Sequence, residues 1–441
     1  MRIAMIAMSG VRAHNPELTR LGLTLPGFAE RARVLSSLPS LSLLTLAGMT
    51  PERHDVRLYE IADIRRLDTL PECDLAAITT LTAQAKDAYE LARRFREQGV
   101  PTVMGGLHAT LLPGEVRQHC DAVVVGEGEL SWPGLLEDVE HRCLRPVYTP
   151  YGREFDLAEA PLPRFDLLQI EKYNRLTVQT QRGCPWRCEF CASSIRLTGR
   201  YKVKPIDKVI GEIRAIKSIW RHPFIEFADD NTFVNKPHAK ALMRALAPEG
   251  VPWFTESDVS VADDPELLAL IAEAGCREIL IGFESPTAAG LDQVELRRNW
   301  KRRRLDGYKA AIERIQSHGI AVNGCFVLGL DGDTPAVFEA IHDFVRDAGL
   351  FDVQVTVMTP FPGTPLYRRL QAEERLLVEG AWERCTLFDV NLRPSRMTVR
   401  ELEDGLLDLV ERLYAPEAKQ ARTRAFRHQV RRGRRATANA C

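Results

Sequence analysis

The sequence lacks three features that would place it in a specialised class of protein. It has no apolar run near the ~20 residues that a membrane-spanning helix needs, so no membrane span is expected. Its 59 basic and 60 acidic residues leave a formal net charge of −1, which disfavours a general nucleic-acid binder. Its ten cysteines are mostly scattered singly, unlike a dense secreted disulfide framework. We therefore expect a globular protein of two or three domains in a reduced, cytoplasmic compartment.

What the sequence does have is one compact group of cysteines. Cys184, Cys188 and Cys191 follow the spacing C-x3-C-x2-C. Iron–sulfur clusters are normally held by four Cys thiolates, so three ligands in one short loop predict a four-iron cluster with one iron open to a non-protein ligand. A structural zinc site is the main alternative, but zinc prefers four closed ligands, commonly as two Cys pairs. No second pair lies nearby, and the closest downstream histidine is His222, so the spacing favours a cluster.

Strand-like and helical segments alternate over residues 1–140. Two of the strand-like runs end in glycine-rich turns, Gly105-Gly106 and Gly126-Glu127-Gly128. Such alternation predicts a parallel sheet. Ligands of these sheets lie beyond the carboxyl ends of the strands, where both turns fall. The first part of the chain is therefore predicted to be an α/β ligand-binding domain.

A second strand–helix alternation begins at residue 173. Its six strands predict a partial β/α barrel, and barrel enzymes work at the carboxyl face of the strands. The cysteine loop comes just after the first of these strands. The predicted units are an α/β domain over 1–140, a proline-rich linker over 141–172, the barrel over 173–370, a helical extension over 371–420, and a basic, disordered tail over 421–441.

The cysteine motif, with the aromatic Phe190 directly before the third cysteine, resembles the signature of the radical S-adenosylmethionine (radical SAM) superfamily. The resemblance implies a [4Fe-4S] cluster whose open iron binds the amino and carboxylate groups of SAM. It also implies that an electron delivered through the cluster cleaves the sulfonium C–S bond. The resulting 5′-deoxyadenosyl radical would abstract hydrogen from an unreactive carbon. An external electron donor such as flavodoxin or ferredoxin is implied as a partner.

The resemblance also implies where the first SAM contacts lie. Phe190 is placed to help hold the adenine. The second barrel strand of the family normally ends in a Gly-Gly-Glu-like turn that receives the methionine amine, whereas this sequence reads Asp229-Asp230-Asn231. Asp229 or Asp230 could supply that contact, or the pair could cap a helix instead.

Two further strands carry SAM contacts by resemblance. The fourth strand ends at Glu284 and Ser285, where the family often contacts the ribose or carboxylate. Glu284 in an apolar strand would be costly to bury unpaired, which favours a functional role. Gly324 and Val327 lie in a strand similar to the adenine-contacting strand of the family, although a glycine there could equally serve tight packing. No general acid or base is assigned.

The first domain resembles the B12-binding domain found in one branch of this superfamily. The similarity lies in the segment from Gly105 to Pro113 and in Val125–Glu129. It implies cobalamin binding near Gly105, Gly106, His108, Gly126, Glu127 and Gly128. The Asp-x-His-x-x-Gly pattern that supplies an axial histidine to cobalt in other B12 proteins is absent. Cobalamin would then bind without a histidine ligand, or the domain has lost it.

The resemblance implies methylation of an unactivated carbon of a small molecule or lipid, with cobalamin supplying the methyl group, as in hopanoid methylases. Radical cyclisation, rearrangement or SAM-fragment transfer without cobalamin stays open. A tRNA-modifying radical SAM enzyme would usually need a second cluster set in the first domain, which has only Cys73 and Cys120. A non-catalytic zinc or cluster-binding protein is the last alternative.

Basic residues outside these motifs have ordinary explanations. The run Arg297–Arg304 surrounds Trp300, which could stack on a base, but a charged outer helix face is the commoner reason for such a run. The arginines of the tail could touch an anionic partner or simply be solvated. Arg182 and Arg187 flank the cysteines and could bias the cluster potential or lie on a loop surface. No nucleic-acid partner is expected.

Overall fold

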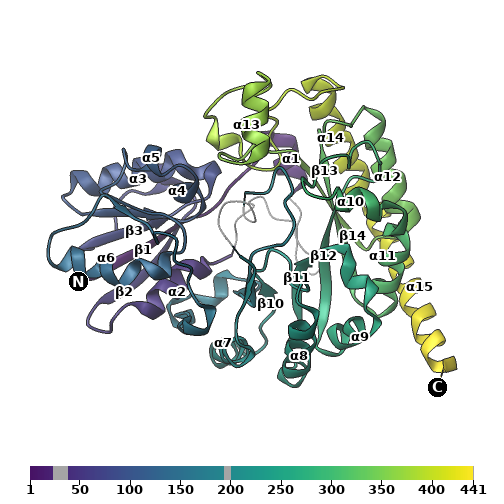
Figure 1. The fold of residues 1–441 in the computed structure, drawn as a ribbon, viewed down its shortest axis with the longest axis horizontal. Coiled ribbons are helices and arrows are strands. Elements are labelled where there is room, and N and C mark those ends of the chain that lie inside the picture. The colour runs from purple at the N-terminus through teal and green to yellow at the C-terminus, as the bar shows by residue number, and fades with distance from the viewer. Residues whose placement is uncertain (23–37, 193–199, 441) are drawn as a thin grey trace.

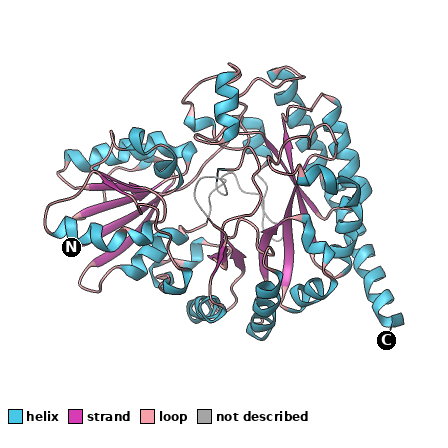
Figure 2. Cartoon of the chain, viewed as in Figure 1, coloured by secondary structure: helices cyan, strands magenta, loops and turns pink. Residues whose placement is uncertain are grey.

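A computed structural model of the protein describes residues 1–22, 38–192 and 200–440. Two six-stranded parallel sheets dominate it, the first on the left of Figure 1 and the second on its right. Helices flank both sheets, as Figure 2 shows. This α/β architecture confirms the predicted fold class, with a Rossmann-like first unit, a partial barrel of six parallel strands and a helical C-terminal part.

The first sheet has the strand order β2-β1-β3-β4-β5-β6. Its order reverses between β1 and β3, which is where ligands of such sheets bind. α2 and α6 pack on one face and α3 on the other. The elements of this unit are β1 (Arg2–Met8), α1 (Pro16–Leu21), α2 (Leu41–Met49), β2 (Asp55–Ile61), β3 (Leu75–Thr79), α3 (Ala85–Glu97), β4 (Thr102–Gly105), α4 (Leu107–Leu111), α5 (Pro113–Val116), β5 (Ala122–Val124), α6 (Trp132–Glu140) and β6 (Val147–Tyr148). β6 thus extends the sheet beyond residue 140, where the sequence predicted a linker.

The second sheet has the order β14-β13-β12-β11-β10-β7, so its strands follow chain order and β7 and β14 remain as edges of an open barrel. A short antiparallel hairpin of β8 and β9 brackets the cysteine loop. The elements are β7 (Leu176–Val178), β8 (Gln181–Arg182), β9 (Lys202–Val203), α7 (Ile206–Ile219), β10 (Ile225–Phe227), α8 (Lys236–Leu246), β11 (Trp253–Ser257), α9 (Pro265–Glu273), β12 (Cys276–Glu284), α10 (Trp300–Arg304), α11 (Tyr308–Ser317), β13 (Ala321–Leu328), α12 (Ala336–Ala348) and β14 (Asp352–Val357).

The two faces of the barrel strands differ in polarity because successive side chains point to opposite sides of a strand. Apolar residues such as Phe227, Trp253 and Phe326 pack toward the helices in the main core. The other face carries Glu226 and Glu256. Glu256 is exposed to the lumen yet surrounded by protein, and this burial, with the neighbouring Glu226 carboxylate, raises the pKa of Glu256 to about 8. The barrel therefore encloses a polar lumen.

Three helices complete the chain, α13 (Pro365–Ala372), α14 (Val399–Tyr414) and α15 (Pro416–Ala440). α15 replaces the disordered tail expected for residues 421–441. Arg422 is only 5% exposed, and it donates hydrogen bonds to the carbonyl oxygens of Leu413 at 2.6 Å and Phe351 at 3.3 Å. Gln429 bonds to Gln316 of α11. A few buried contacts thus order a segment whose composition resembles a tail.

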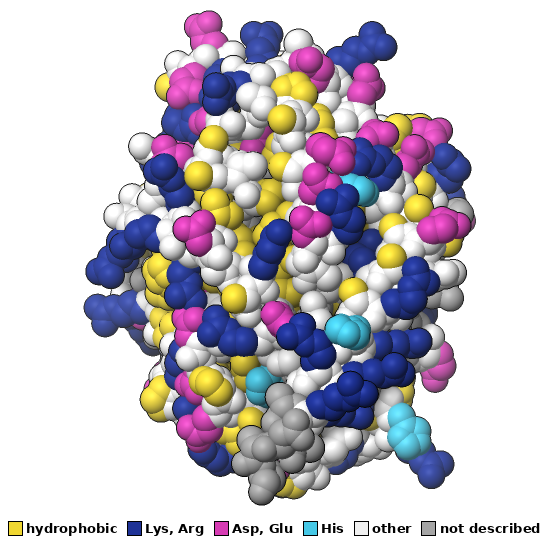
Figure 3. All heavy atoms as spheres, turned by 90° about the vertical axis from the view of Figure 1, so that its right-hand side faces the viewer, with side chains coloured by type: hydrophobic (Ala, Val, Ile, Leu, Met, Phe, Trp, Pro, Cys, Tyr) yellow, Lys and Arg dark blue, Asp and Glu magenta, His cyan; other side chains and the backbone are white. Residues whose placement is uncertain are grey.

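The outer helices present a basic surface to solvent. Lys and Arg side chains are spread over the lower part of the face in Figure 3, which is the right-hand side of Figure 1. None of the described helices is both long enough and apolar enough to cross a membrane.

Replacement of Arg422 by alanine tests the docking of α15. We expect R422A to lower the free energy of unfolding by about 3 kcal/mol, because the buried Asp352 carboxylate, 3.7 Å from the guanidinium, and two carbonyl oxygens lose this cation. The exposed Arg431 on the same helix is the control, and R431A should stay within about 0.5 kcal/mol of the wild type. Thermal unfolding of the three proteins measures both changes. Equal midpoints for R422A and R431A would contradict a docked helix.

Candidate functional site

The cysteine loop is fixed to the barrel by backbone hydrogen bonds. Cys188 forms an antiparallel bridge with Glu295, and the Glu189 amide donates to the carbonyl of Val294 at 2.9 Å. On the other side, the Leu366 amide donates to the carbonyl of Glu189 at 3.2 Å. The Glu189 carboxylate also binds both ends of the Arg369 guanidinium, at 2.6 and 2.8 Å. The loop is thus held between the segment after β12 and the start of α13.

The three thiols lie in partly buried positions that disfavour negative charge. Burial raises the pKa of Cys184 to about 11 and raises the pKa of Cys188 further above its usual range. Two neighbours act in the opposite direction, because the Asn231 amide donates to the Cys184 sulfur at 3.8 Å and the Lys301 ammonium lies near Cys188. Thiolates here therefore need added positive charge, which a bound metal supplies when it displaces the protons.

The spread of the cysteine sulfurs fits an iron–sulfur cluster better than one zinc ion. Sulfur ligands of a tetrahedral zinc lie about 3.8 Å apart, given a Zn–S distance of ~2.3 Å. In the described part of the chain, one group of three potential ligand atoms lies within 4.8 Å of one another, and it does not include the cysteines. The three cysteine sulfurs therefore do not all lie within 4.8 Å of one another, which agrees better with the corners of a cluster than with one zinc ion.

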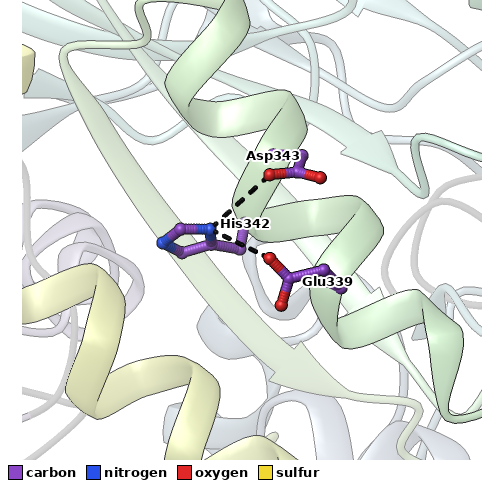
Figure 4. A group of neighbouring side chains, drawn as sticks. All are labelled: Glu339, His342 and Asp343. Atoms are coloured by element: carbon purple, nitrogen blue, oxygen red, sulfur yellow. Dashed lines mark ion pairs between the residues drawn. The ribbon is translucent and has the colours of Figure 1, made fainter.

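That other group consists of Glu339, His342 and Asp343 on α12 (Figure 4). The His342 Nδ1 atom lies 3.6 Å from Glu339 and 3.9 Å from Asp343. Glu339 is also bound by Arg412 and Asp343 by Arg346, both at 2.8 Å. These residues form an ion-pair network on the outer surface, away from the cysteine loop.

The two predicted acidic residues after β10 hold the backbone that leads into the cysteine loop. The Asp229 carboxylate accepts from the amides of Thr180 at 2.8 Å and Gln181 at 3.1 Å, and from the hydroxyls of Thr180 and Thr232. Asp230 accepts from the Gly183 amide at 2.9 Å. Burial outweighs these bonds and raises the pKa of Asp229 to about 6. Both side chains thereby join the end of β10 to the chain beside Cys184.

Glu284 lies buried at the end of β12 in a left-handed backbone conformation, with φ of 64°. Its carboxylate pairs with the Lys301 ammonium at 2.6 Å, and Lys301 also donates to the carbonyl of Gly282 at 2.6 Å. A Cβ at Gly282 would lie 2.6 Å from the Glu284 carboxylate oxygen, so the pair needs glycine there. Lys301 is buried, and the expectation that the whole run from Arg297 to Arg304 lines an outer helix face is wrong at this position.

The remaining predicted SAM residues surround the carboxyl ends of β12 and β13. Phe190 packs against an apolar cluster that includes Val327. Ser285 is fully buried, and its hydroxyl accepts from the Thr287 amide at 3.2 Å. A Cβ at Gly324 would lie 2.8 Å from the Leu350 side chain, so this glycine permits close packing on the helix side of the sheet.

Sequence reasoning missed Asp333 as a residue of this rim. Its carboxylate accepts from the amides of Gly329 at 3.1 Å and Leu330 at 3.0 Å. The other carboxylate oxygen is buried without a hydrogen-bond partner, and burial raises the pKa of Asp333 to about 7. The signal in the sequence was a second acidic residue in the Gly-Leu-Asp-Gly-Asp turn after an apolar strand.

A cavity of about 560 Å³ lies between the carboxyl ends of the first sheet and the β7 and β10 ends of the barrel. The first domain contributes five of the six predicted cobalamin residues, namely Gly105, Gly106, Gly126, Glu127 and Gly128. The barrel side contributes Thr177, Gln179, Arg182 and Asp230. A ligand in this cavity would therefore touch both domains.

His108, the sixth predicted residue, does not line the cavity. It is a fully buried residue of α4, and its Nε2 atom hydrogen-bonds with the Tyr89 hydroxyl at 2.8 Å. This burial lowers the pKa of His108 to about 4, so the imidazole is neutral.

Ion pairs join the two domains beside the cavity. Arg182 of β8 donates to the carboxylates of Glu127 at 2.6 Å and Glu129 at 2.7 Å. Lys202 of β9 also binds Glu127, at 2.6 Å. Both strands of the hairpin that brackets the cysteine loop are thus anchored on the glycine turn of the first domain. Arg182 is neither a loop-surface residue nor a free cation beside the cysteines.

The Asp333 carboxyl predicts a specific dependence of stability on pH. Its folded-state pKa of about 7 lies above the ordinary value of 3.8, so the stability that its proton provides is complete below pH 3.8 and is lost as the pH rises toward 7. D333N should remove this loss. The difference in the free energy of unfolding between D333N and the wild type should therefore grow by up to about 2 kcal/mol between pH 5 and pH 8. Thermal unfolding at the two pH values measures the difference. If D333N differed from the wild type in stability by the same amount at pH 5 and pH 8, Asp333 would be ionised at both pH values.

Comparison with known proteins agrees with this geometry. Residues 178–345 match the family model of the radical SAM superfamily, and residues 31–136 match that of the B12 binding domain. Residues 364–440 match a domain of unknown function.

Similar proteins cover most of the chain. The bacteriochlorophyllide d C-12(1)-methyltransferase of Chlorobaculum tepidum is 28% identical over 86% of this chain and 83% of its own. The hopanoid C-2 methylase of Rhodopseudomonas palustris is 27% identical over 87% and 73%. The structure of the radical SAM methyltransferase TsrM from Kitasatospora setae, with cobalamin and a [4Fe-4S] cluster bound, shares the fold with a TM-score of 0.68 at 15% identity, over 99% of both chains. The chain thus carries a radical SAM domain over residues 178–345, preceded by a B12-binding domain over residues 31–136.

Proposed function

We propose that this protein is a cobalamin-dependent radical SAM methyltransferase that methylates an unactivated carbon of a small molecule or lipid. The observation that carries the proposal is the cavity shared by the two domains. It joins the glycine turns of the B12-binding domain to Arg182 and Asp230, which adjoin the cysteine loop. Relatives named as methyltransferases of bacteriochlorophyllide and as a hopanoid methylase support the reaction type.

The cofactors would supply the difficult chemistry, namely one-electron cleavage of SAM to a 5′-deoxyadenosyl radical at the cluster and delivery of a methyl group by cobalamin. Cys184, Cys188 and Cys191 would hold the cluster as thiolates. Asp229 and Asp230 would keep the loop backbone in place through the amide bonds described above.

Further residues of the barrel rim would bind and orient SAM. Phe190, Asp230, Glu284, Ser285 and Val327 lie on or beside the strand ends around the cysteine loop. The Lys301 ammonium would keep Glu284 ionised and fixed in its unusual backbone conformation. Gly324 would act by permitting close packing beneath this rim, and Asp229 by fixing the chain above it.

In the B12-binding domain, the glycine turns would let a large ligand approach the backbone closely. Gly106 has φ of 92°, and a Cβ there would lie 2.4 Å from the Thr79 hydroxyl, so no other residue fits this turn. His108 is bonded to Tyr89 away from the cavity, which agrees with cobalamin bound without a histidine from this chain. The absence of the Asp-x-His-x-x-Gly pattern points the same way.

The alternatives receive less support. Cys73 and Cys120 are both buried in an apolar core of the first domain, which does not suit the second cluster of many tRNA-modifying relatives. The separated cysteine sulfurs disfavour a zinc protein. An external one-electron donor such as flavodoxin or ferredoxin, in a reducing cytoplasm, would complete the system.

Anaerobic reconstitution tests the radical SAM assignment. The wild type should bind about four irons with sulfide per chain and should form 5′-deoxyadenosine from SAM and dithionite. C188A should lose cluster and product together, because one of three ligands is gone. C143A, which removes an exposed thiol outside the loop, should match the wild type. Native product formation by C188A would contradict the ligand assignment.

The Arg182 contacts predict how the domains hold cobalamin. R182Q removes the cation that joins Glu127 and Glu129, so the turn beside the cavity loses an anchor. We expect the Kd of hydroxocobalamin, followed by its absorption spectrum, to rise about tenfold, a loss of ~1.4 kcal/mol. R145Q breaks an exposed ion pair with Asp138 in the first domain. This control variant should leave the Kd of hydroxocobalamin unchanged. If R182Q and the wild type bound hydroxocobalamin with the same Kd, Arg182 would have no role in cobalamin binding.

A further inference from the structure

We propose that a basic surface beside the cysteine loop is the docking site of an acidic one-electron donor protein. This surface, the arginine ridge, consists of Arg187, Arg297, Arg298 and Arg303, together with the exposed Leu296 that precedes Arg297 in the chain. The proposal rests on the proposed function, since a radical SAM enzyme needs an electron for each cleavage that is not recovered.

The arginine ridge is built directly on the cysteine loop. The Leu296 amide donates to the carbonyl of Arg187 at 3.0 Å, and the next loop residue, Cys188, bridges to Glu295. The Glu295 carboxylate then accepts from the amides of Arg297 at 3.0 Å and Arg298 at 2.8 Å. A protein seated on these arginines would thus contact the same peptide segments that hold a cluster ligand. Electron transfer falls off steeply with distance, so this closeness is what a donor site requires.

The charge of the arginine ridge is available to a partner. All four arginine side chains are exposed, and no carboxylate forms an ion pair with any of them in the part of the chain that the structure describes. The neighbouring Arg302 and Arg304 differ, because they pair with Asp292 at 3.1 Å and Asp263 at 2.6 Å. The formal net charge of the whole protein is only −1, yet the arginine ridge carries positive charge without ion-pair partners in the described residues. Such a surface would attract an acidic partner.

The arginine ridge also has an apolar residue and a rigid base of the kind that a protein interface uses. Leu296, whose backbone is bonded to that of Arg187, is 47% exposed. In the same two segments, the rings of Trp186 and Trp300 stack with centroids 4.4 Å apart, and the Trp186 indole donates to Asp258 at 2.7 Å. Trp300 is therefore committed to a partner within the chain, which disfavours its use as a platform for a nucleic-acid base. An acidic protein is the occupant that these contacts favour.

The electron step needs no group from the ridge itself. The reduced flavin or iron–sulfur centre of the donor would give up one electron to the cluster that Cys184, Cys188 and Cys191 would hold, and no bond or proton would change on this chain. The arginines would raise the rate of encounter and fix the orientation of the donor. Such steering is weakened by salt, because the Debye length is only ~8 Å at physiological ionic strength.

The test compares two reductants on the anaerobically reconstituted protein. R297E/R298E reverses the charge of the ridge, and R434E/R435E makes the same charge change on α15. These control arginines follow Gly433, which packs against Ser317 at the far end of α11 from α10. Reduced flavodoxin and dithionite are each mixed with the proteins, and cluster reduction is followed by absorbance and electron paramagnetic resonance.

We expect R297E/R298E to slow reduction by flavodoxin at least tenfold at low salt and to remove most of its salt dependence, as electrostatic steering requires. Reduction by dithionite should be unchanged, and R434E/R435E should match the wild type with both reductants. Equal rates with flavodoxin for R297E/R298E and the wild type would overturn the proposal. The proposal would also be overturned if R297E/R298E and R303E both slowed cluster reduction by dithionite as much as by flavodoxin. The arginine ridge would then support the cluster and not a partner.

Flavodoxin affinity separates this proposal from the proposed function. The Kd of oxidised flavodoxin, measured by calorimetry at low salt, should rise at least tenfold in R297E/R298E even in preparations without a cluster. If the protein formed no cluster but the Kd of flavodoxin still differed between R297E/R298E and the wild type, the proposed function would be wrong. The docking site would still be supported. Tighter binding of a single-stranded RNA than of flavodoxin, lost in the same variant, would assign the ridge to nucleic acid and overturn the proposal.

Discussion

The arrangement of this site depends on carboxylates that hold an irregular loop in place. The stretch that carries the three cysteines, residues 184–191, forms neither a helix nor a strand, yet buried backbone amides must be paired. Asp229 and Asp230 accept from the chain before Cys184, Glu189 fixes the middle of the loop to Arg369, and Glu295 orders the segment that covers it. The raised pKa of Asp229 measures what burial of such a carboxylate costs. Regular secondary structure sets the frame, but acidic side chains set the geometry of the ligands.

The two sheets become one site because their carboxyl ends face each other. Each sheet alone would present a rim for a ligand. The β8–β9 hairpin joins them, since Arg182 and Lys202 reach the Glu127 turn while the same hairpin carries the cysteine loop. A displacement of the first domain would therefore move the loop as well, because ion pairs with little exposure join the Glu127 turn to the hairpin that carries the cysteines. Such pairs are specific in direction, which hydrophobic packing alone is not.

The sequence predicted well those features that depend on a few neighbouring residues. It predicted poorly those that depend on contacts between residues far apart in the chain. The alternation of strands and helices over residues 1–140 and the C-x3-C-x2-C motif could be read directly, because apolar runs and ligand spacing are properties of a few consecutive residues. Lys301 could not, since a lysine within a run of arginines resembles a solvated helix face until Glu284 is placed beside it. α15 was missed for a similar reason, because its polar composition hides the buried contacts of Arg422. The roles of the predicted SAM and cobalamin residues stay predictions, since position on a rim does not establish contact.

The environment of the three cysteines also limits what chemistry they can perform. A nucleophilic cysteine needs a lowered pKa, usually from a helix N-terminus or a nearby cation. Here burial raises the pKa of Cys184 and Cys188, and the Lys301 ammonium that could oppose this is already paired with Glu284. The thiols are thus poor nucleophiles and become anionic only when metal replaces their protons. The cluster proposed for this loop would therefore depend on the acidic side chains that order the loop backbone as well as on the three sulfurs.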